Sequence, residues 1–438
     1  MFERLRQASA AQKEKTRLKL LLEACDRLLT EAGESISQRL ASEALALYQD
    51  LTADSRLSFF LALADRFNPD VAAVRDLSAR YAASADPNDL MALIDKAEPP
   101  RQELFRRLNQ VPHGCAVLIG LRMDLLSHLK KHPILRLVDA DLQHLLSSWF
   151  NPGFLSLESL NWQSPAGLLE KIIAHEAVHE IDGWGDLRRR LEPDRRLFAY
   201  FHPALPNEPL IFVEVALLVE MPEAIAPLLD RKRPIEGDPK QVKVAAFYSI
   251  SNCQPGLKGV HLGNFLIKRV AESLKKEFPS LKTFCTLSPI PGLVSWLASD
   301  TPLPTEPFTS KAHSSLEKLR TEWSARVAGQ QNSLASLLSL AEQPGQSEAI
   351  SRLAGAYLKA TPRLDDRLSD PVARFHLNNG ARLERVNALA NLSPKGIRQS
   401  LGAMVNYLYD LDQIEPNHEA FVAGEVTASS LVSKSFTG

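Results

Sequence analysis

The sequence predicts two regions of different structural class: an all-α helical bundle over residues 1–150, followed by an α+β domain with a central mixed sheet over residues 151–438. The length of 438 residues exceeds a comfortable single hydrophobic core. Apolar residues at helical spacing run almost without interruption through the first 150 residues. Alternating patterns of the kind that strands show begin only after that point.

The first region carries amphipathic helices separated by prolines. The helix-spaced apolar residues are Leu57, Phe60, Leu61 and Ala64 in one helix, and Leu142, Leu145, Leu146 and Trp149 in another. Asp139 is the predicted N-cap of the second helix. Short turns between such helices favour an antiparallel bundle. The region contains no catalytic constellation, so we expect a role in packing or oligomerisation.

The second region is built around a strand, a loop, a helix and a second strand between Val242 and Gly292. Two further strands are predicted before this core, at residues 197–202 and 210–219. The core begins with alternating apolar residues from Val242 to Tyr248 and ends with a return strand, Thr283–Leu287. The sequence again predicts helices near residues 310–360, which we interpret as an insertion in this region.

A glycine loop links the first strand of this core to its helix. Gly256, Gly259 and Gly263 surround Lys258 and His261. Glycine lets a backbone approach a phosphate closely, and a helix start offers free N–H groups and a partial positive charge. The loop therefore suits a pyrophosphate such as that of coenzyme A. It matches neither the Walker nor the dinucleotide spacing, and a plain strand-to-helix turn is the alternative.

Ser288 follows the return strand and precedes Pro289 and Pro291. A serine held between a strand end and two prolines is rigidly aimed, and catalytic groups favour such positions. The alternative is a serine that caps the turn.

Residues 175–179, His-Glu-Ala-Val-His, match the His-Glu-x-x-His signature of zinc peptidases. In that signature, His175 and His179 would lie on one face of a helix with Glu176 between them. Glu208 and Glu214 lie downstream, where a third ligand could be sought. The turn that begins at residue 182 leaves little helix after the second histidine. We therefore interpret the match as accidental and expect no metal, with a zinc peptidase as a distant alternative.

Composition excludes several classes of protein. A net charge of −1 gives no general attraction to nucleic acid or to an anionic membrane. The richest apolar run, residues 209–219, is too short to span a bilayer. The start lacks the apolar core of a signal peptide, so we expect a cytoplasmic protein. The four cysteines lie far apart and indicate neither a disulfide framework nor a cysteine zinc site; they are Cys25, Cys115, Cys253 and Cys285.

Several segments, in the same order, resemble the malonyl-CoA decarboxylase family and cover most of residues 145–412. They include Glu176-Ala177-Val178-His179, Asp186-Leu187-Arg188-Arg189-Arg190, Phe247-Tyr248-Ser249-Ile250-Ser251, Leu287-Ser288-Pro289-Ile290-Pro291-Gly292, and Asp370-Pro371-Val372-Ala373-Arg374-Phe375-His376. The resemblance implies a GNAT-like catalytic domain and a helical N-terminal domain that takes part in subunit association. A homo-oligomer is therefore expected.

The resemblance also assigns roles to residues. Ser288 and His376 match the catalytic serine and histidine of the family, usually assigned as proton acceptor and proton donor. Ser249 and Tyr409 match positions near the reacting end of the substrate. His261 is a departure, because relatives carry glutamate there. The segment expected to bind coenzyme A comprises Lys258, Gly259, Val260, His261, Leu262, Gly263 and Asn264.

The chemistry implied is the conversion of malonyl-CoA to acetyl-CoA and carbon dioxide. The thioester accepts the electrons left by the departing carboxylate, so we expect no metal, biotin or pyridoxal. Ser288 would orient the departing carboxylate, and His376, whose ordinary pKa lies near neutrality, would protonate the enolate. Two alternatives are an acyltransferase of the same fold and a non-catalytic helical assembly module with a vestigial acyl-CoA site.

Overall fold

The computed structural model describes residues 2–31, 33–232, 241–260, 262, 266–330 and 333–436. The chain forms two compact units. A helical unit comprises Met1–Ser156, Phe201–Glu208 and Gln254–Leu262. An α+β unit comprises Leu157–Tyr200, Pro209–Cys253 and Gly263–Gly438. The predicted fold class, a helical N-terminal region followed by an α+β region with a mixed sheet, is confirmed.

The helical unit contains α1 (Phe2–Thr30), α2 (Glu34–Gln49), α3 (Ala53–Arg66), α4 (Val71–Ser84), α5 (Pro87–Ala97), α6 (Pro100–Leu108), α7 (Gly114–His128) and α8 (Arg136–Trp149). Its core is rich in leucine and phenylalanine, with Phe59 and Phe60 fully buried at the centre. The predicted N-cap was wrong: α8 begins at Arg136, so Asp139 lies within its first turn. There its carboxylate accepts a hydrogen bond from the buried Arg122 over 2.8 Å.

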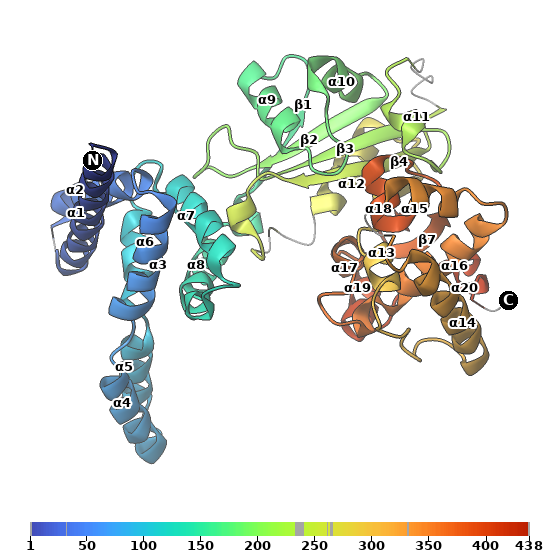
Figure 1. Cartoon of the computed structure of the whole chain (residues 1–438). Helices are drawn as coiled ribbons and strands as arrows, with labels where there is room; N and C mark the ends of the chain where they lie inside the picture. Colours follow the sequence, from blue (N-terminus) through green and yellow to red (C-terminus); the bar gives the residue numbers. More distant parts are fainter. Residues whose placement is uncertain are drawn as a thin grey trace. The chain divides into compact units, whose positions relative to one another are not determined.

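Helices α4 and α5 form a hairpin, drawn as a narrow pair at the lower left of Figure 1. Neither helix contains a buried residue. Large apolar side chains on it face solvent, including Val71 at 81% exposure and Met91 at 68%. The hairpin therefore receives little stabilisation from burial of its own apolar surface.

The α+β unit is organised around one mixed sheet. Its strands are β1 (Ser156–Leu160), β2 (Arg195–Phe201), β3 (Ile211–Leu218), β4 (Val244–Asn252), β5 (Thr283–Thr286), β6 (Ser288–Pro289), β7 (Arg382–Asn387) and β8 (Met404–Leu408). They lie in the order β1-β2-β3-β4-β5-β8-β6, with β7 also paired to β8. The β4–β5 pair is parallel, and the other described pairings are antiparallel.

Helices of this unit are α9 (Ala166–His175), α10 (Gly183–Arg190), α11 (Ala226–Leu229), α12 (Leu266–Glu277), α13 (Leu293–Leu297), α14 (Ser310–Val327), α15 (Leu334–Ala341), α16 (Gln346–Ala360), α17 (Pro371–Asn378), α18 (Pro394–Ser400), α19 (Ile414–Val422) and α20 (Ser430–Lys434). Helix α12 connects the parallel strands and buries Leu266, Val270 and Leu274 along one face. Figure 1 shows α13 to α17 gathered with α19 and α20 in the orange and red part of the unit.

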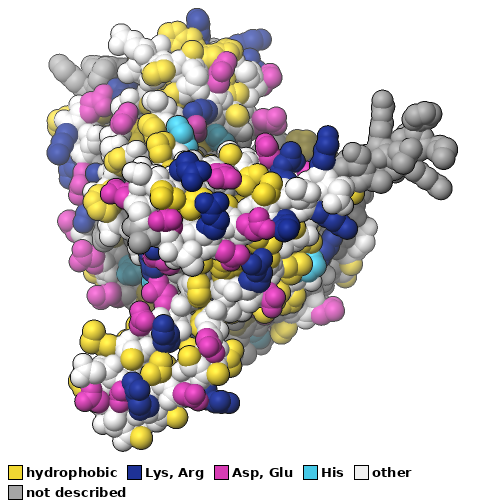
Figure 2. All heavy atoms as spheres, turned by 90° about the vertical axis from the view of Figure 1, so that its left-hand side faces the viewer, with side chains coloured by type: hydrophobic (Ala, Val, Ile, Leu, Met, Phe, Trp, Pro, Cys, Tyr) yellow, Lys and Arg dark blue, Asp and Glu magenta, His cyan; other side chains and the backbone are white. Residues whose placement is uncertain are grey.

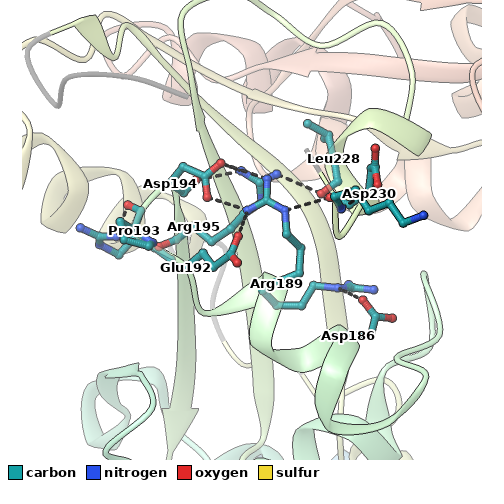
Figure 3. A network of polar contacts seen from close by, with 11 residues as sticks. Asp186, Arg189, Glu192, Pro193, Asp194, Arg195, Leu228 and Asp230 are labelled. Atoms are coloured by element: carbon teal, nitrogen blue, oxygen red, sulfur yellow. Dashed lines mark hydrogen bonds and ion pairs between the residues drawn. The ribbon is translucent and has the colours of Figure 1, made fainter. Parts of the chain in front are cut away.

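A network of arginines and carboxylates joins α10 to the start of β2 (Figure 3). Asp194 is its centre: its two carboxylate oxygens accept hydrogen bonds from Arg189 over 2.7 and 3.0 Å, and one of them also accepts from Arg195 over 2.8 Å. Arg195 donates onward to the carbonyl of Leu228, and Arg189 to that of Asp230. Bidentate pairing of this kind fixes geometry as well as charge, so the network holds α10 and α11 on the sheet.

The structure removes the geometric basis of the zinc-peptidase signature. Helix α9 ends at His175, and Glu176 has an extended backbone with ψ of 110°. His175 and His179 therefore do not share a helix face, which the signature requires. In the part of the chain that the structure describes, no group of three or more His, Cys, Asp or Glu side chains is arranged to hold a metal ion.

The surface carries both signs of charge. On the face shown in Figure 2, Lys and Arg side chains alternate with Asp and Glu, without a large field of one sign. This distribution agrees with the net charge of −1. Within the described ranges, no helix combines the length and the apolar character needed to cross a bilayer.

Candidate active site

A cavity opens where two parallel strands of the sheet diverge. Strands β4 and β5 pair from Val244 to Phe247, after which the chain turns and Ser288 of β6 pairs instead with Val405 of β8. The cavity, of about 280 Å³, lies in the gap between β4 and β6. Most of its lining residues are apolar, and they come from β3, β4, β6, α17 and the loop after α9. The lining residues with polar side chains are Tyr248, Ser249, Asn252, Ser288 and His376.

Ser288 and His376, predicted as the catalytic pair, lie in contact on one wall of this cavity. The Ser288 hydroxyl oxygen is 3.0 Å from Nε2 of His376. On the other side of the ring, Nδ1 of His376 is 2.8 Å from the hydroxyl of Tyr409. The structure thus brings three of the predicted site residues, from β6, α17 and the end of β8, into one chain of hydrogen bonds.

The neighbouring hydrogen bonds determine which group donates and which accepts between Ser288, His376 and Tyr409. Ser288 donates its hydrogen to the Thr286 hydroxyl over 2.9 Å, and the Thr286 oxygen also accepts the backbone N–H of Tyr407. A neutral imidazole donates from one nitrogen and accepts at the other. Because the hydrogen of Ser288 is used, Nε2–H of His376 donates to Ser288, and Nδ1 accepts from Tyr409.

Burial keeps the imidazole neutral. His376 is only 3% exposed, and burial lowers the pKa of its imidazole to about 3. The ordinary pKa of histidine, near neutrality, therefore does not apply to His376 in this environment. One face of the ring stacks on Tyr407, with centroids 4.6 Å apart and an interplanar angle of 27°. Burial also raises the pKa of Tyr409 well above its ordinary value. The three hydrogen-bonded side chains Ser288, His376 and Tyr409 are therefore uncharged at neutral pH.

Asp370 joins the helix that carries His376 to the loop that follows Ser288. It is the N-cap of α17, accepting hydrogen bonds from the N–H groups of Val372 and Ala373 over 3.0 and 2.9 Å. Its other carboxylate oxygen accepts the N–H of Gly292 over 3.1 Å. Burial raises the pKa of this carboxyl to about 6, although the three N–H groups oppose the shift. Asp370 thereby fixes α17 against the loop next to Ser288.

The opposite wall of the cavity is formed by β4 and carries Ser249. Its hydroxyl donates to the carboxylate of Glu176, whose two oxygens lie 2.8 and 2.7 Å from Ser249 Oγ. Ser251, two residues further along the strand, donates to the same carboxylate over 3.2 Å. Ser249 lines the cavity, whereas Ser251 does not. The predicted residue Ser249 therefore shares the cavity of Ser288 and His376 but belongs to a separate hydrogen-bond network.

The glycine loop belongs to the helical unit and is held there through its carbonyl groups. Arg122 of α7 donates to the carbonyl of Gly256 over 2.8 Å, and Gln143 of α8 donates to that of Gly259 over 2.9 Å. A Cβ at Gly256 would lie 2.1 Å from the carbonyl oxygen of Ile119. This glycine therefore permits a close approach to a helix rather than to a phosphate.

The prediction that the loop offers its N–H groups to a pyrophosphate fails at two positions. The N–H groups of Lys258 and Val260 donate within the loop, to the carbonyls of Pro255 and Leu257. Gly259 has a left-handed backbone with φ of +79°, which suits glycine. Leu262 is buried. His261, Gly263 and Asn264 lie outside the described residues.

The chain matches known proteins along nearly its whole length. The model of the malonyl-CoA decarboxylase C-terminal domain matches residues 153–438, and that of the N-terminal domain matches residues 67–150. The chain belongs to the malonyl-CoA decarboxylase family.

Curated relatives and solved structures agree with this assignment. The mitochondrial malonyl-CoA decarboxylase of Anser anser anser is 34% identical over 88% of this chain and 81% of its own length, and that of Rattus norvegicus is 37% identical over 75% and 69%. The crystal structure of malonyl-CoA decarboxylase from Rhodopseudomonas palustris has a TM-score of 0.81 at 44% identity, covering 95% of this chain and 99% of that one. The enzyme from Cupriavidus metallidurans has a TM-score of 0.73 at 36% identity, covering 97% and 100%.

Three residues of the site were not singled out by sequence reasoning. Glu176 was named only within the zinc signature and a family motif, and Thr286 only within the return strand Thr283–Leu287. Asp370 stands directly before Pro371, and an aspartate followed by proline is a recognised helix start. That signal was available in the sequence, whereas the long-range partners of Glu176 and Thr286 were not.

Proposed function

We propose that this chain converts malonyl-CoA to acetyl-CoA and carbon dioxide at the cavity between β4 and β6. The observation that carries the proposal is the hydrogen-bonded chain Ser288–His376–Tyr409 on the cavity wall of a member of this family. A pocket lined by apolar residues with a few convergent polar groups is the usual form of a small-molecule site. The splayed strands that form it are the feature expected of a GNAT-like fold.

The reaction needs three things from the protein. The carboxylate must be held with its breaking bond out of the plane of the thioester, the enolate oxygen must be stabilised, and the enolate carbon must receive a proton. We assign the orientation of the departing carboxylate to Ser288 and the protonation of the enolate to His376. Orientation and electrostatic stabilisation together can supply most of the acceleration.

A neutral His376 is a competent acid for this step. The carbon of a thioester enolate is far more basic than an alcohol or phenol oxygen, so a protonated imidazole is not required. The Nε2–H of His376 lies toward Ser288 at the cavity wall, and Tyr409 can return a proton to Nδ1. The C–C bond to the carboxylate breaks, its electrons form the enolate, and the enolate carbon takes the proton. Solvent then restores that proton to the protein.

The loop Lys258–Asn264 is our proposed binding segment for the nucleotide end of coenzyme A. Lys258 supplies a positive charge, and Gly259 supplies a left-handed turn. Because the N–H groups of Lys258 and Val260 are used within the loop, we now assign the phosphate contacts to the Lys258 side chain and to the remaining backbone. Lys258→Ala should raise the KM for malonyl-CoA severalfold with little change in kcat, since a phosphate contact is made equally in the ground and transition states.

Assembly and location are the finer parts of the proposal. We propose that the helical unit mediates a homo-oligomer through the α4–α5 hairpin, because an exposed apolar face of this kind marks an interaction surface. Val71→Asp combined with Met91→Asp should then reduce the mass measured by light scattering, while a charge placed on another helix of the unit should not. A cytoplasmic location remains a prediction, and the curated relatives are named mitochondrial.

The decisive experiment is incubation of the purified protein with malonyl-CoA and no additive. Acetyl-CoA and carbon dioxide should appear in equal amounts. An acyltransferase would instead release free coenzyme A from acetyl-CoA and an amine acceptor. A vestigial site would bind coenzyme A esters without turnover. Either of these results, with no acetyl-CoA formed from malonyl-CoA, would refute the proposed activity.

A further inference from the structure

The β4 wall of the cavity is backed by a carboxylate that the reaction scheme does not use. Glu176 follows the last residue of α9 and is 9% exposed. Besides the two serines, it accepts hydrogen bonds from the N–H groups of Val178 and His179, both over 2.8 Å. The loop after α9 therefore curls around this carboxylate, and Val178 of the same loop lines the cavity.

The partners of Glu176 determine what Ser249 can offer to a ligand. All four are donors, two N–H groups and two hydroxyls, which is the set that suits an ionised carboxylate acting only as an acceptor. A hydroxyl has a single hydrogen, and that of Ser249 is directed at Glu176. Ser249 lines the cavity but has no hydrogen left to donate to a ligand there.

Two described cations contact the backbone of the loop that surrounds the carboxylate. Lys395 donates to the carbonyl of Ala177 over 2.5 Å. Arg190 donates to the carbonyl of His179 over 3.1 Å and forms a buried ion pair with Glu214. Glu176 also affects the pKa of a neighbouring carboxyl. Burial raises the pKa of Glu214 to about 7; the charge of Arg190 opposes this shift, and the charge of Glu176 adds to it.

The part of the cavity lining that the structure describes offers no lysine or arginine to a carboxylate. A salt bridge would stabilise the malonyl carboxylate in the ground state and be lost when that group leaves as neutral carbon dioxide, so it would raise the barrier. A negative charge behind the wall acts in the opposite sense, because its repulsion is relieved as the carboxylate leaves.

We propose that Glu176 is a positioning residue for this decarboxylation: it turns the Ser249 hydroxyl hydrogen away from the cavity and places a negative charge behind the β4 wall, so that this wall disfavours the bound carboxylate and promotes its departure. The inference rests on the proposed activity and deepens it. It explains why an apolar cavity of a decarboxylase is backed by an anion. It also assigns to Ser249 a role different from that of Ser288.

Glu176→Gln tests the inference with little change in shape. The glutamine carbonyl can accept the two backbone N–H groups, and its amide can donate to Ser249 and Ser251, which frees the Ser249 hydrogen for the cavity. We expect kcat to fall by about tenfold to a hundredfold. The KM for malonyl-CoA should fall or stay the same, because ground-state repulsion is removed. The Kd of acetyl-CoA, which has no carboxylate, should not change.

A matched pair of serine variants provides a second measurement. Ser249 and Ser251 both donate to Glu176, but only Ser249 lines the cavity. Ser249→Ala removes the oxygen lone pair that the β4 wall offers to a ligand and should lower kcat by about tenfold or more. Ser251→Ala should lower it by less than about threefold, below the usual worth of one hydrogen bond, because Ser251 does not line the cavity. In the double variant Glu176→Gln, Ser249→Ala, the two losses should be clearly less than additive, because both changes act through one network.

Three results would overturn the inference. One is an unchanged kcat in Glu176→Gln. Another is equal weakening of acetyl-CoA and malonyl-CoA binding, which indicates a purely structural role. If near-UV circular dichroism shows that Glu176→Gln does not fold, the serine pair decides, and equal losses in Ser249→Ala and Ser251→Ala are the third. Failure of the activity itself is distinguishable, because then the unsubstituted protein would form no acetyl-CoA.

Discussion

The two walls of the cavity present the same functional group in opposite hydrogen-bonding states. On β4, the Ser249 hydroxyl donates to the carboxylate of Glu176. On β6, the Ser288 hydroxyl accepts from the neutral imidazole of His376 and donates to the neutral hydroxyl of Thr286. The hydrogen of Ser249 is held firmly by the carboxylate, because charge-assisted hydrogen bonds are about twice as strong as neutral ones. The hydrogen of Ser288 is bonded to a neutral hydroxyl and can be redirected at little cost.

This difference shows that the hydrogen-bond partner of a serine decides whether the serine can donate to a ligand. Ser249 can only accept from a ligand, so its hydroxyl does not bind an anion. Ser288 can rotate its hydrogen toward a substrate oxygen while remaining bonded to His376. The β4 wall thus disfavours the carboxylate, whereas the β6 wall can orient it and supply the proton to the enolate. The following predictions test this comparison, from the largest expected effect to the smallest.

Removing either member of the Ser288–His376 pair should have the largest effect. Ser288→Ala and His376→Ala should each lower kcat on the order of a thousandfold, because each removes the proton source or its link to the substrate. The Kd of acetyl-CoA should change little, since the coenzyme A contacts remain. Steady-state rates and isothermal titration measure the two quantities. Near-normal rates in both variants would remove this pair from the mechanism.

The two tyrosines beside His376 allow a comparison within the second wall. Tyr409 bonds to Nδ1, whereas Tyr407 stacks on the ring and its hydroxyl has no hydrogen-bond partner among the described residues. Tyr409→Phe should lower kcat about tenfold, because the tautomer and the return of the proton are no longer fixed. Tyr407→Phe keeps the stacked ring and should lower kcat less than about twofold. Equal effects would contradict the assigned tautomer.

Acid stability should report the buried neutral histidine. The folded pKa of His376, about 3, lies below the ordinary value of 6.5, so the unfolded chain binds the proton first as pH falls. The contribution of His376 to stability is therefore complete above pH 6.5 and is lost as pH falls from 6.5 toward 3. The slope is up to about 1.4 kcal/mol per pH unit.

His376→Gln should flatten the pH dependence of the free energy of unfolding by about one proton in this range, measured by urea denaturation from pH 4.5 to 6.5. His179, whose pKa burial also lowers to about 3, should retain its own contribution. The carboxyls of Glu214 and Asp370, with raised pKa values, contribute in the opposite sense and cancel in the comparison. A variant with an unchanged slope would show that His376 is charged in the folded protein.

A loss no larger than that of Tyr409→Phe is expected at Thr286. Thr286→Val removes the acceptor of the Ser288 hydrogen and a partner of the Tyr407 N–H. One ordinary hydrogen bond corresponds to about a threefold to tenfold loss in kcat. Thr286→Ser keeps the hydroxyl and should stay close to the unsubstituted rate. If Thr286→Val were as inactive as Ser288→Ala, Ser288 would depend on Thr286 for more than the orientation of its hydrogen.

Much of the fold could be predicted because it follows local rules. The pattern of apolar residues located α3, α12 and the strands β2 to β5, since the helices bury one face each and the strands are buried along nearly their whole length. The capping prediction failed at Asp139 because the aspartate has a tertiary partner, Arg122. In the zinc signature, the spacing was right and the conformation was not: α9 ends at His175, where Glu176 turns to accept the N–H groups of its own loop.

The site could be predicted only through family resemblance, because its contacts join residues far apart in the chain. Ser288 meets His376 across 88 positions, and Ser249 meets Glu176 across 73. No periodicity signals such pairs. The shift in the pKa of His376 was equally hidden, since it depends on burial in the folded protein.

The attachment of the glycine loop through Gly256 and Gly259 to α7 and α8 has a practical consequence for engineering. A truncated protein that begins after residue 156 would keep every residue of the β4–β6 cavity but lose Arg122 and Gln143. Residues 254–262 would then have no scaffold to define their conformation. Such a fragment would be a poor substitute for the complete enzyme in ligand screening.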